Sequence, residues 1–252
     1  GKGCQSKFNG MWAFVIWDNY EKKLWISRDR FGVKPLYYMF DEDFLIVCSE
    51  IKSIIPIHEL TPNLQEIYSY FVDGPSEAHK ETFFNSIYRF PSGCSATYSL
   101  RSKSESLVFD KYWKLDHPSK ENSFSMKRLK EYTDEYLYLL RDAVKIRLYA
   151  DVKVSCALSG GLDSSSITYL AYQILKEQGK STDALMTVSN VYKDKDYSHC
   201  DESKFIDHIV NKLNIINYRS EPDLDGLSQK NNAGLWYYES CYDYLPFSGL
   251  NT

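Results

Sequence analysis

The residues best suited to chemistry form one short segment of the 252-residue chain. The segment consists of Ser159, Gly160, Gly161, Leu162, Asp163, Ser164 and Ser165, and it joins an apolar stretch to an amphipathic one. Glycines at such a junction let the backbone turn sharply and come close to an anion. A helix that begins there offers unpaired N–H groups and a partial positive charge, and the serine hydroxyls add further donors. The pattern therefore predicts a phosphate-binding loop.

Asp163 is an acidic residue set inside this predicted anion site. A bound Mg²⁺ explains it best, because this cation bridges a carboxylate and phosphate oxygens. The segment has no lysine after its glycines, as the common P-loop has, and it lacks the G-x-G-x-x-G pattern. The competing interpretation is a glycine-rich turn whose Ser or Asp only caps the next helix. The number of specified residues in this context favours phosphate binding.

The segments around this loop alternate between strand and helix patterns. Strands are predicted at residues 152–158, 184–188 and 215–219, and helices at 125–149, 164–178 and 201–213, with Gly179 as a C-cap. Strand–helix alternation predicts a parallel sheet with right-handed crossovers. The predicted loop then lies at the carboxyl edge of the sheet, where ligands bind in open α/β folds.

The first part of the chain has mainly strand patterns. Strands are predicted at residues 11–17, 23–27, 35–40, 44–48 and 95–100, and the first four form two hairpins. Ser49 is expected to cap a short helix at 50–54, and Pro62 is expected to open another helix after Thr61. A polar stretch at 114–123 predicts a boundary between domains at 1–118 and 119–252.

Composition excludes several classes of protein. The chain has 30 basic and 34 acidic residues and no long cluster of Lys and Arg, so no nucleic-acid partner is expected. No apolar run approaches the roughly 20 residues of a membrane helix, so no membrane partner is expected either. The six cysteines are scattered and lack zinc-ligand spacing. In a chain with room for an adequate core, this favours a reducing compartment and a cytoplasmic location.

Residues 159–165 resemble the pyrophosphate loop of the glutamine-dependent asparagine synthetases. An independent set of motifs in the first part of the chain is similar to the later half of that family's glutaminase domain. Its members are FNGMWAF at 8–14, Trp17-Asp18, RDRFGVKPLYY at 28–38, and SEIK at 49–52. Tyr112-Trp113 resembles the segment just before the synthetase domain. Both sets occur in the family's order, so the resemblance covers nearly the whole chain.

The resemblance implies both a fold and a reaction. The fold is part of an α+β, N-terminal-nucleophile-type amidohydrolase domain with antiparallel sheets, followed by part of an α/β, parallel-sheet ATP-pyrophosphatase-type domain. Both domains are expected to be incomplete. The family releases ammonia from glutamine, adenylates aspartate with Mg-ATP, and converts the adenylate to asparagine. The implied cofactors are ATP and Mg²⁺, the implied partners are aspartate and glutamine or ammonia, and a homodimer is left open.

The resemblance also assigns roles to single residues. Those expected to hold the ATP phosphates are Ser159, Gly160, Gly161, Asp163, Ser164 and Ser165, with Asp163 also at the metal. Leu158 and Val188 match positions that line the adenine pocket, and plain sheet core is the alternative for both. Glu202 matches an acidic position of the family, or it is simply a carboxylate at a helix start. Arg28, Asp29 and Arg30 are expected to form a structural ion pair that holds the hairpin, rather than to face a tunnel or a domain interface.

The chain departs from the family pattern in two places. The family's nucleophile is a cysteine at the mature N-terminus, whereas residue 1 is Gly, and Cys4 directly precedes residues that match the middle of the domain. No catalytic residue is therefore assigned, and this chain alone is expected not to hydrolyse glutamine. A second, acidic loop of the family is missing. Three alternatives stay open: a related synthetase that forms a β-lactam or macrolactam, another pyrophosphate-loop ligase or tRNA-modifying enzyme, and an inactive fragment with only the ATP-binding loop.

Overall fold

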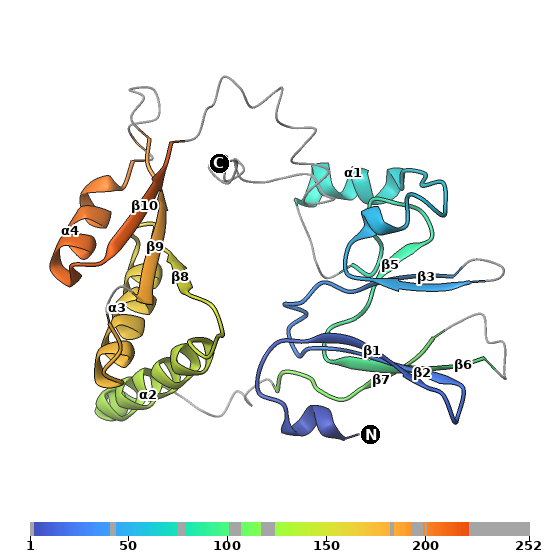
Figure 1. Cartoon of the computed structure of the whole chain (residues 1–252), viewed down its shortest axis with the longest axis horizontal. Coiled ribbons are helices and arrows are strands. Elements are labelled where there is room, and N and C mark those ends of the chain that lie inside the picture. The colour runs from blue at the N-terminus through green and yellow to red at the C-terminus, as the bar shows by residue number, and fades with distance from the viewer. Residues whose placement is uncertain are drawn as a thin grey trace. The chain divides into compact units, whose positions relative to one another are not determined.

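The computed structural model describes residues 3–40, 44–74, 79–100, 107–116, 124–181, 184–192, 199 and 201–221. The described residues form two compact units, 3–116 and 124–221, which are drawn in Figure 1. The predicted boundary between residues 118 and 119 lies outside the described residues and stays a prediction.

The first unit contains two antiparallel sheets. One has the strand order β1-β2-β6-β7, from β1 (Ala13–Asp18), β2 (Lys23–Arg28), β6 (Cys94–Ser99) and β7 (Val108–Lys111). The other has the order β4-β3-β5, from β4 (Leu45–Cys48), β3 (Tyr37–Phe40) and β5 (Ile87–Arg89). The structure confirms both predicted hairpins and the strand at β6. It adds β5 and β7, which are three and four residues long and too short to show a periodic pattern.

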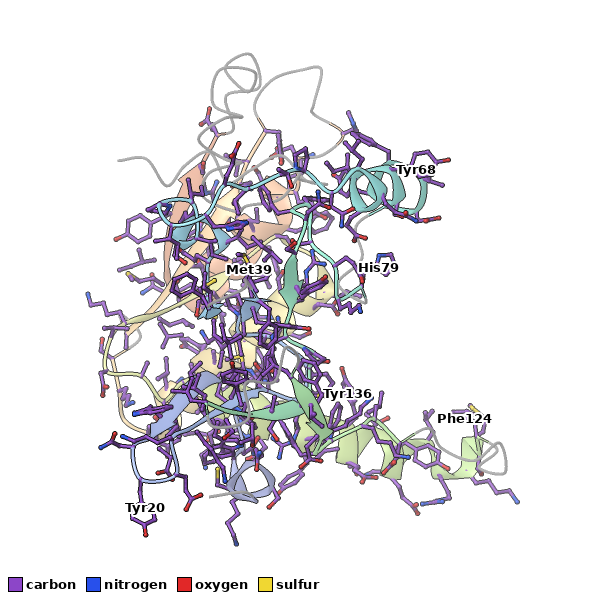
Figure 2. The ribbon with its side chains drawn as sticks, turned by 90° about the vertical axis from the view of Figure 1, so that its right-hand side faces the viewer. Tyr20, Met39, Tyr68, His79, Phe124 and Tyr136 are labelled. Carbon is purple, nitrogen blue, oxygen red and sulfur yellow. The ribbon has the colours of Figure 1, made fainter. Side chains whose placement is uncertain are left out.

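Strand β3 shows how the two sheets share one core. Tyr38 packs in an apolar cluster with Ile26 of β2 and Ala96 of β6, whereas its neighbour Met39 packs on the opposite side with Ile54. Successive side chains of a strand point to opposite faces, so one face of β3 meets the first sheet and the other meets a helical segment. Figure 2 shows Met39 among other side chains, while Tyr20 points away at the β1–β2 turn.

The short helix after β4 begins one residue later than predicted. It is a single 3₁₀ turn, η2 (Ile51–Ser53), with Glu50 rather than Ser49 at its N-cap, and no side chain caps it. The Ser53 hydroxyl donates instead to the main-chain oxygen of Glu50 at 2.6 Å. The prediction of Ser49 as the cap is therefore wrong.

Helix α1 (Leu64–Asp73) also begins later than predicted. Its N-cap is Asn63, whose side-chain oxygen accepts the N–H of Glu66 at 3.3 Å. Pro62 does not open the helix, because residues 61–63, directly before the helix, pair with the chain at Phe83–Asn85. The main-chain N–H of Asn63 donates to Phe83 O at 2.7 Å, and that of Asn85 donates to Thr61 O at 2.9 Å. This pairing outweighs the preference of proline for the first helical position.

Arg28 and Asp29 hold the turn that follows β2 through its backbone. The guanidinium of Arg28 donates to the carbonyl oxygens of Gly32 at 2.6 Å, Lys34 at 2.8 Å and Phe90 at 2.7 Å. The buried carboxylate of Asp29 accepts the N–H groups of Phe31, Val33 and Lys34 at 2.9–3.1 Å. Both residues thus hold this part of the structure through bonds to backbone groups, whereas the expected ion pair between them stays a prediction.

Two further contacts join distant segments to this turn. Tyr112 donates its hydroxyl to Arg28 O at 2.5 Å, and burial, the largest cause, raises the pKa of Tyr112 to about 12. Arg30 donates to Phe8 O at 2.7 Å, just after the 3₁₀ helix η1 (Cys4–Lys7). The turn therefore links the start of the chain to the segment after β7.

The second unit contains the predicted parallel sheet. Its order is β8-β9-β10, from β8 (Val154–Ala157), β9 (Leu185–Asn190) and β10 (Ile216–Ser220). Helix α3 (Leu162–Glu177) connects β8 to β9, and α4 (Ser203–Leu213) connects β9 to β10. The expected long helix is α2 (Leu129–Arg147), preceded by the 3₁₀ turn η3 (Met126–Arg128). The strand–helix alternation is thus confirmed (Figure 1).

The helices of this unit pack on one face of the sheet. Leu185 of β9 is buried in a cluster with Val144 of α2 and Ile174 of α3. On the opposite face, Ile216 and Tyr218 of β10 are exposed. The face of β9 toward the helices is therefore the buried one, and its other face is half-buried.

The described residues also bear on two expectations, one about membrane-spanning helices and one about the cysteines. None of the helices among them is both long and apolar enough to span a bilayer. Cys4, Cys94 and Cys156 are free thiols, and burial raises the pKa of Cys94 and of Cys156. Cys94 and Cys156 therefore stay protonated at neutral pH, as expected of small packing residues.

We predict that Asp29→Ala lowers the free energy of unfolding of the first unit by about 3 kcal/mol, since three N–H groups lose a charged acceptor. Urea denaturation followed by tryptophan fluorescence measures this. Asp18→Ala is the matched control, because Asp18 accepts the N–H groups of Tyr20 and Glu21 in an exposed turn. It is expected to cost no more than about 1 kcal/mol. Equal losses in the two variants would contradict the role given to Asp29.

Candidate functional site

Leu158 anchors the start of the loop between β8 and α3. Its side chain is buried in a cluster with Val191 and Ile206. Its N–H donates to Val188 O at 2.8 Å, and its carbonyl oxygen accepts the Ser189 hydroxyl at 2.6 Å. The loop therefore leaves the sheet from a fixed position, and both main-chain groups of Leu158 are already bonded.

Ser159 and Ser164 bond to each other across the loop. Their hydroxyl oxygens lie 3.0 Å apart, and the N–H of Ser159 donates to Ser164 Oγ at 3.2 Å. Ser164 Oγ also donates to Gly161 O at 3.2 Å, and Gly161 N–H donates to Ser159 Oγ at 3.3 Å. The structure thus brings two of the predicted serines together at the beginning of α3.

The two glycines of the loop differ in what they require. Gly160 has φ +89°, a conformation that favours glycine, whereas Gly161 has φ −68° and ψ 165°, which any residue adopts. A Cβ on Gly160 would lie 3.0 Å from Phe205 Cβ and 3.2 Å from Glu202 O. A Cβ on Gly161 would meet only Ser159 Oγ, at 3.4 Å. Gly160 is therefore needed for packing on α4, and Gly161 serves as the N-cap of α3 without steric need.

Asp163 and Ser165 lie in the first turn of α3. Asp163 is exposed. The hydroxyl of Ser165 is buried and has no hydrogen-bond partner in the described part of the chain. No set of three or more His, Cys, Asp or Glu side chains suited to a metal occurs among the described residues. Asp163 could hold a Mg²⁺ as a single carboxylate ligand, because this ion commonly takes its other ligands from phosphate and water.

The start of α4 lies against the loop through Glu202. Asp201, which sequence reasoning did not single out, accepts the Ser203 hydroxyl at 2.6 Å and the Tyr192 N–H at 3.2 Å. These bonds, that from Ser203 first, hold the pKa of Asp201 below its usual value. An Asp two residues before the first helical residue was a signal that could have revealed these bonds. Glu202 is exposed, and both interpretations of its carboxylate stay open.

A polar layer lies under the loop, and the sequence pattern did not reveal it. Thr187 and Ser189 of β9 are buried, and the side chain of Asn217 of β10 donates to both hydroxyls. Alternation of polar and apolar residues in β9 is typical of a strand with one solvent face. Here the polar residues lie on the buried side instead, because hydrogen bonds satisfy them.

Two family models match the chain: a glutamine amidotransferase domain over residues 1–113 and an asparagine synthase over residues 135–245. A Methanocaldococcus jannaschii protein, provisionally named asparagine synthetase (glutamine-hydrolyzing) 2, is 37% identical over 180 residues, which are 66% of this chain and 32% of the relative. Amidase chyE of Penicillium rubens is 30% identical over 98% of this chain and 36% of its own length.

Asparagine synthetase (glutamine-hydrolyzing) 3 of Bacillus subtilis is 26% identical over 93% of this chain and 40% of its own length. The chain thus spans about a third of the length of the curated relatives it matches.

We predict that Gly160→Ala lowers the free energy of unfolding of the second unit by about 2 kcal/mol. The backbone of this residue is strained for any side chain, and the added Cβ would also lie too close to Glu202 O. Gly161→Ala is expected to change it by less than about 1 kcal/mol. Thermal unfolding followed by circular dichroism compares the variants. A larger loss for Gly161→Ala would show that the turn depends on the other glycine.

Proposed function

Since the chain belongs to the glutamine-hydrolysing asparagine synthetase family, we propose that its second unit binds the phosphates of ATP for an amide-forming ligase. The observation that carries the proposal is the pair of Ser159 and Ser164 hydroxyl groups, which hydrogen bonds within the loop hold at the N-terminus of α3. Such a helix start favours an anion both by its unpaired N–H groups and by its dipole. The unpaired buried hydroxyl of Ser165 and the exposed carboxylate of Asp163 fit a magnesium-bound phosphate chain.

The proposed reaction activates the side-chain carboxylate of aspartate with ATP, and ammonia from glutamine then displaces AMP to give asparagine. The carboxylate attacks the α-phosphorus, and pyrophosphate leaves. The loop would stabilise the negative charge on the departing pyrophosphate by donors that are already in position. Asp163 would hold Mg²⁺, which neutralises phosphate charge when bound. The contribution of this chain is thus positioning and electrostatic stabilisation rather than covalent chemistry.

Val188 is the residue that we propose lines the binding site for the adenine ring. It lies on the half-buried face of β9, opposite the helices, and pairs with Ala157 at the end of β8, where the loop begins. Leu158 differs, because its side chain is buried and its main-chain groups are bonded within the sheet. These contacts favour the core role that was left open for Leu158.

A second candidate function is amide chemistry on another carboxylate. An amidase aligns with 98% of this chain, and the asparagine synthetase 3 of Bacillus subtilis aligns with 93%. Among the described residues, the group around the loop recognises phosphate and does not select an acceptor. We propose small-molecule substrates and a cytoplasmic setting for both candidates, and the free thiols support the latter.

The test is ATP–pyrophosphate exchange in the native protein that contains this chain, with ammonium present and with or without aspartate. Exchange that requires aspartate, together with asparagine as the product, supports the proposal. Exchange that requires a different carboxylic acid supports the second candidate. Absence of both exchange and Mg-ATP binding would overturn the phosphate-loop assignment.

We predict that Asp163→Asn weakens Mg-ATP binding at least tenfold and metal-free ATP binding less than twofold, because a carboxylate binds a hard cation far better than an amide. Isothermal titration calorimetry with and without Mg²⁺ measures both affinities. Asp142→Asn removes an equal charge from an exposed position of α2 and should leave them unchanged. Equal losses with and without the metal in Asp163→Asn would remove this residue from the metal site.

A further inference from the structure

We propose that Ser189 is a positioning residue that, oriented by Asn217, holds the first N–H group of the phosphate loop on Ser164 Oγ, within the donor group that would meet the ligand. The inference rests on the proposed phosphate-binding function of that loop. It concerns residues on β9 and β10, which lie beneath the loop and do not touch the ligand themselves.

The first step is the bond between Ser189 and Leu158. The Ser189 hydroxyl donates to the carbonyl oxygen of Leu158 at 2.6 Å. Ser189 is 2% exposed and Leu158 is 1% exposed, so water does not compete for this bond. A hydrogen bond in such surroundings holds its carbonyl in one direction.

The second step follows from the planarity of the peptide bond. The carbonyl of Leu158 and the N–H of Ser159 belong to one rigid trans unit, so they point in opposite directions. When Ser189 holds the oxygen, the N–H must point to the other side. There it donates to Ser164 Oγ at 3.2 Å, in the group of donors at the start of α3. Ser189 therefore orients a donor that it does not contact.

The third step is the role of Asn217. Its amide group donates to Ser189 Oγ at 2.9 Å and to Thr187 Oγ1 at 3.0 Å. Each hydroxyl has one hydrogen, so a hydroxyl that accepts from Asn217 donates its own hydrogen elsewhere. Ser189 donates to Leu158 O, and Thr187 donates to Ile216 O at 3.0 Å. Asn217 thus sets the direction of both hydroxyl groups.

The orientation of the Asn217 amide is itself determined by a charged neighbour. Arg219 Nε donates to Asn217 Oδ1 at 3.0 Å, and the same guanidinium pairs with Asp207 of α4. Because Arg219 can only donate, the amide oxygen faces it and the NH₂ group faces the hydroxyls. The polar chain therefore runs from α4 through β10 and β9 to the loop.

Thr187 provides a matched control within the same layer. It is buried as deeply as Ser189 and accepts from the same amide, but its hydroxyl is directed to β10 rather than to the loop. Ser189→Ala and Thr187→Val each remove one buried hydroxyl that accepts from the Asn217 amide and donates to a carbonyl oxygen. Only the first variant releases the peptide unit that carries the Ser159 N–H.

The experiment compares the two variants in the full chain. Calorimetry measures affinity for Mg-ATP, inorganic pyrophosphate and adenosine, and NMR measures hydrogen exchange of the Ser159 amide without ligand. Ser189→Ala is expected to weaken Mg-ATP and pyrophosphate about five- to tenfold, to leave adenosine unchanged, and to speed the exchange. Thr187→Val should change each affinity less than twofold. Asn217→Asp, which puts acceptors in place of both donors, should reproduce the loss, and Ser189→Thr, which keeps the hydroxyl, should restore binding.

The outcomes separate this inference from the proposed function. The inference fails alone in two cases, both with a wild-type chain that binds Mg-ATP. In one, Ser189→Ala and Thr187→Val have the same affinity for Mg-ATP. In the other, Ser189→Ala loses affinity for adenosine as much as for Mg-ATP. If the wild-type chain binds neither Mg-ATP nor pyrophosphate, the proposed function fails and this inference fails with it. Should Ser189→Ala not fold, Asn217→Asp and Ser189→Thr decide by the same measurements.

Discussion

The path from β8 into α3 depends on the left-handed backbone of Gly160. This residue lies so close to Phe205 and to the main chain of Glu202 that no side chain fits without a shift. The turn lets Leu158 stay in the core while the next residues reach the surface at the helix start. The direction of the donors, the packing of α4 on the loop and the exposure of Asp163 all follow from it. A loop under this constraint is organised before any ligand arrives, which is what electrostatic stabilisation requires.

Both units use side chains to satisfy backbone groups where regular structure ends. Asp29 binds three N–H groups of one turn, and Arg28 binds two carbonyl oxygens of that turn and the carbonyl oxygen of Phe90. Asn63 caps α1, and Ser189 holds a carbonyl at the end of β8. Unpaired backbone groups are costly when buried, so these side chains decide where each element stops. In a sequence, polar residues of this kind look like candidates for catalysis, but these side chains bind backbone groups of the same chain.

Much of the fold follows from short-range patterns that the sequence displays openly. The hairpins, the strand–helix alternation and the glycine-rich junction are set by local periodicity, and each was predictable. Helix α1 was misplaced because Thr61 and Pro62 pair with residues far along the chain, which outweighs local preference. Strands β5 and β7 were too short to show a pattern. Within the site, residue types indicated a phosphate loop, but only the backbone angles separate the role of Gly160 from that of Gly161.

The contacts around Arg28 have a consequence for the order in which the chain folds. They join this residue to Phe90 and Tyr112, which lie 62 and 84 positions further along. The first unit therefore cannot complete these bonds until Tyr112 has left the ribosome, and it must close large loops to do so. The polar bonds of the second unit link residues about 30 positions apart, such as Leu158 and Ser189. Since folding slows as contacts become less local, the unit synthesised later is the one whose contacts form faster.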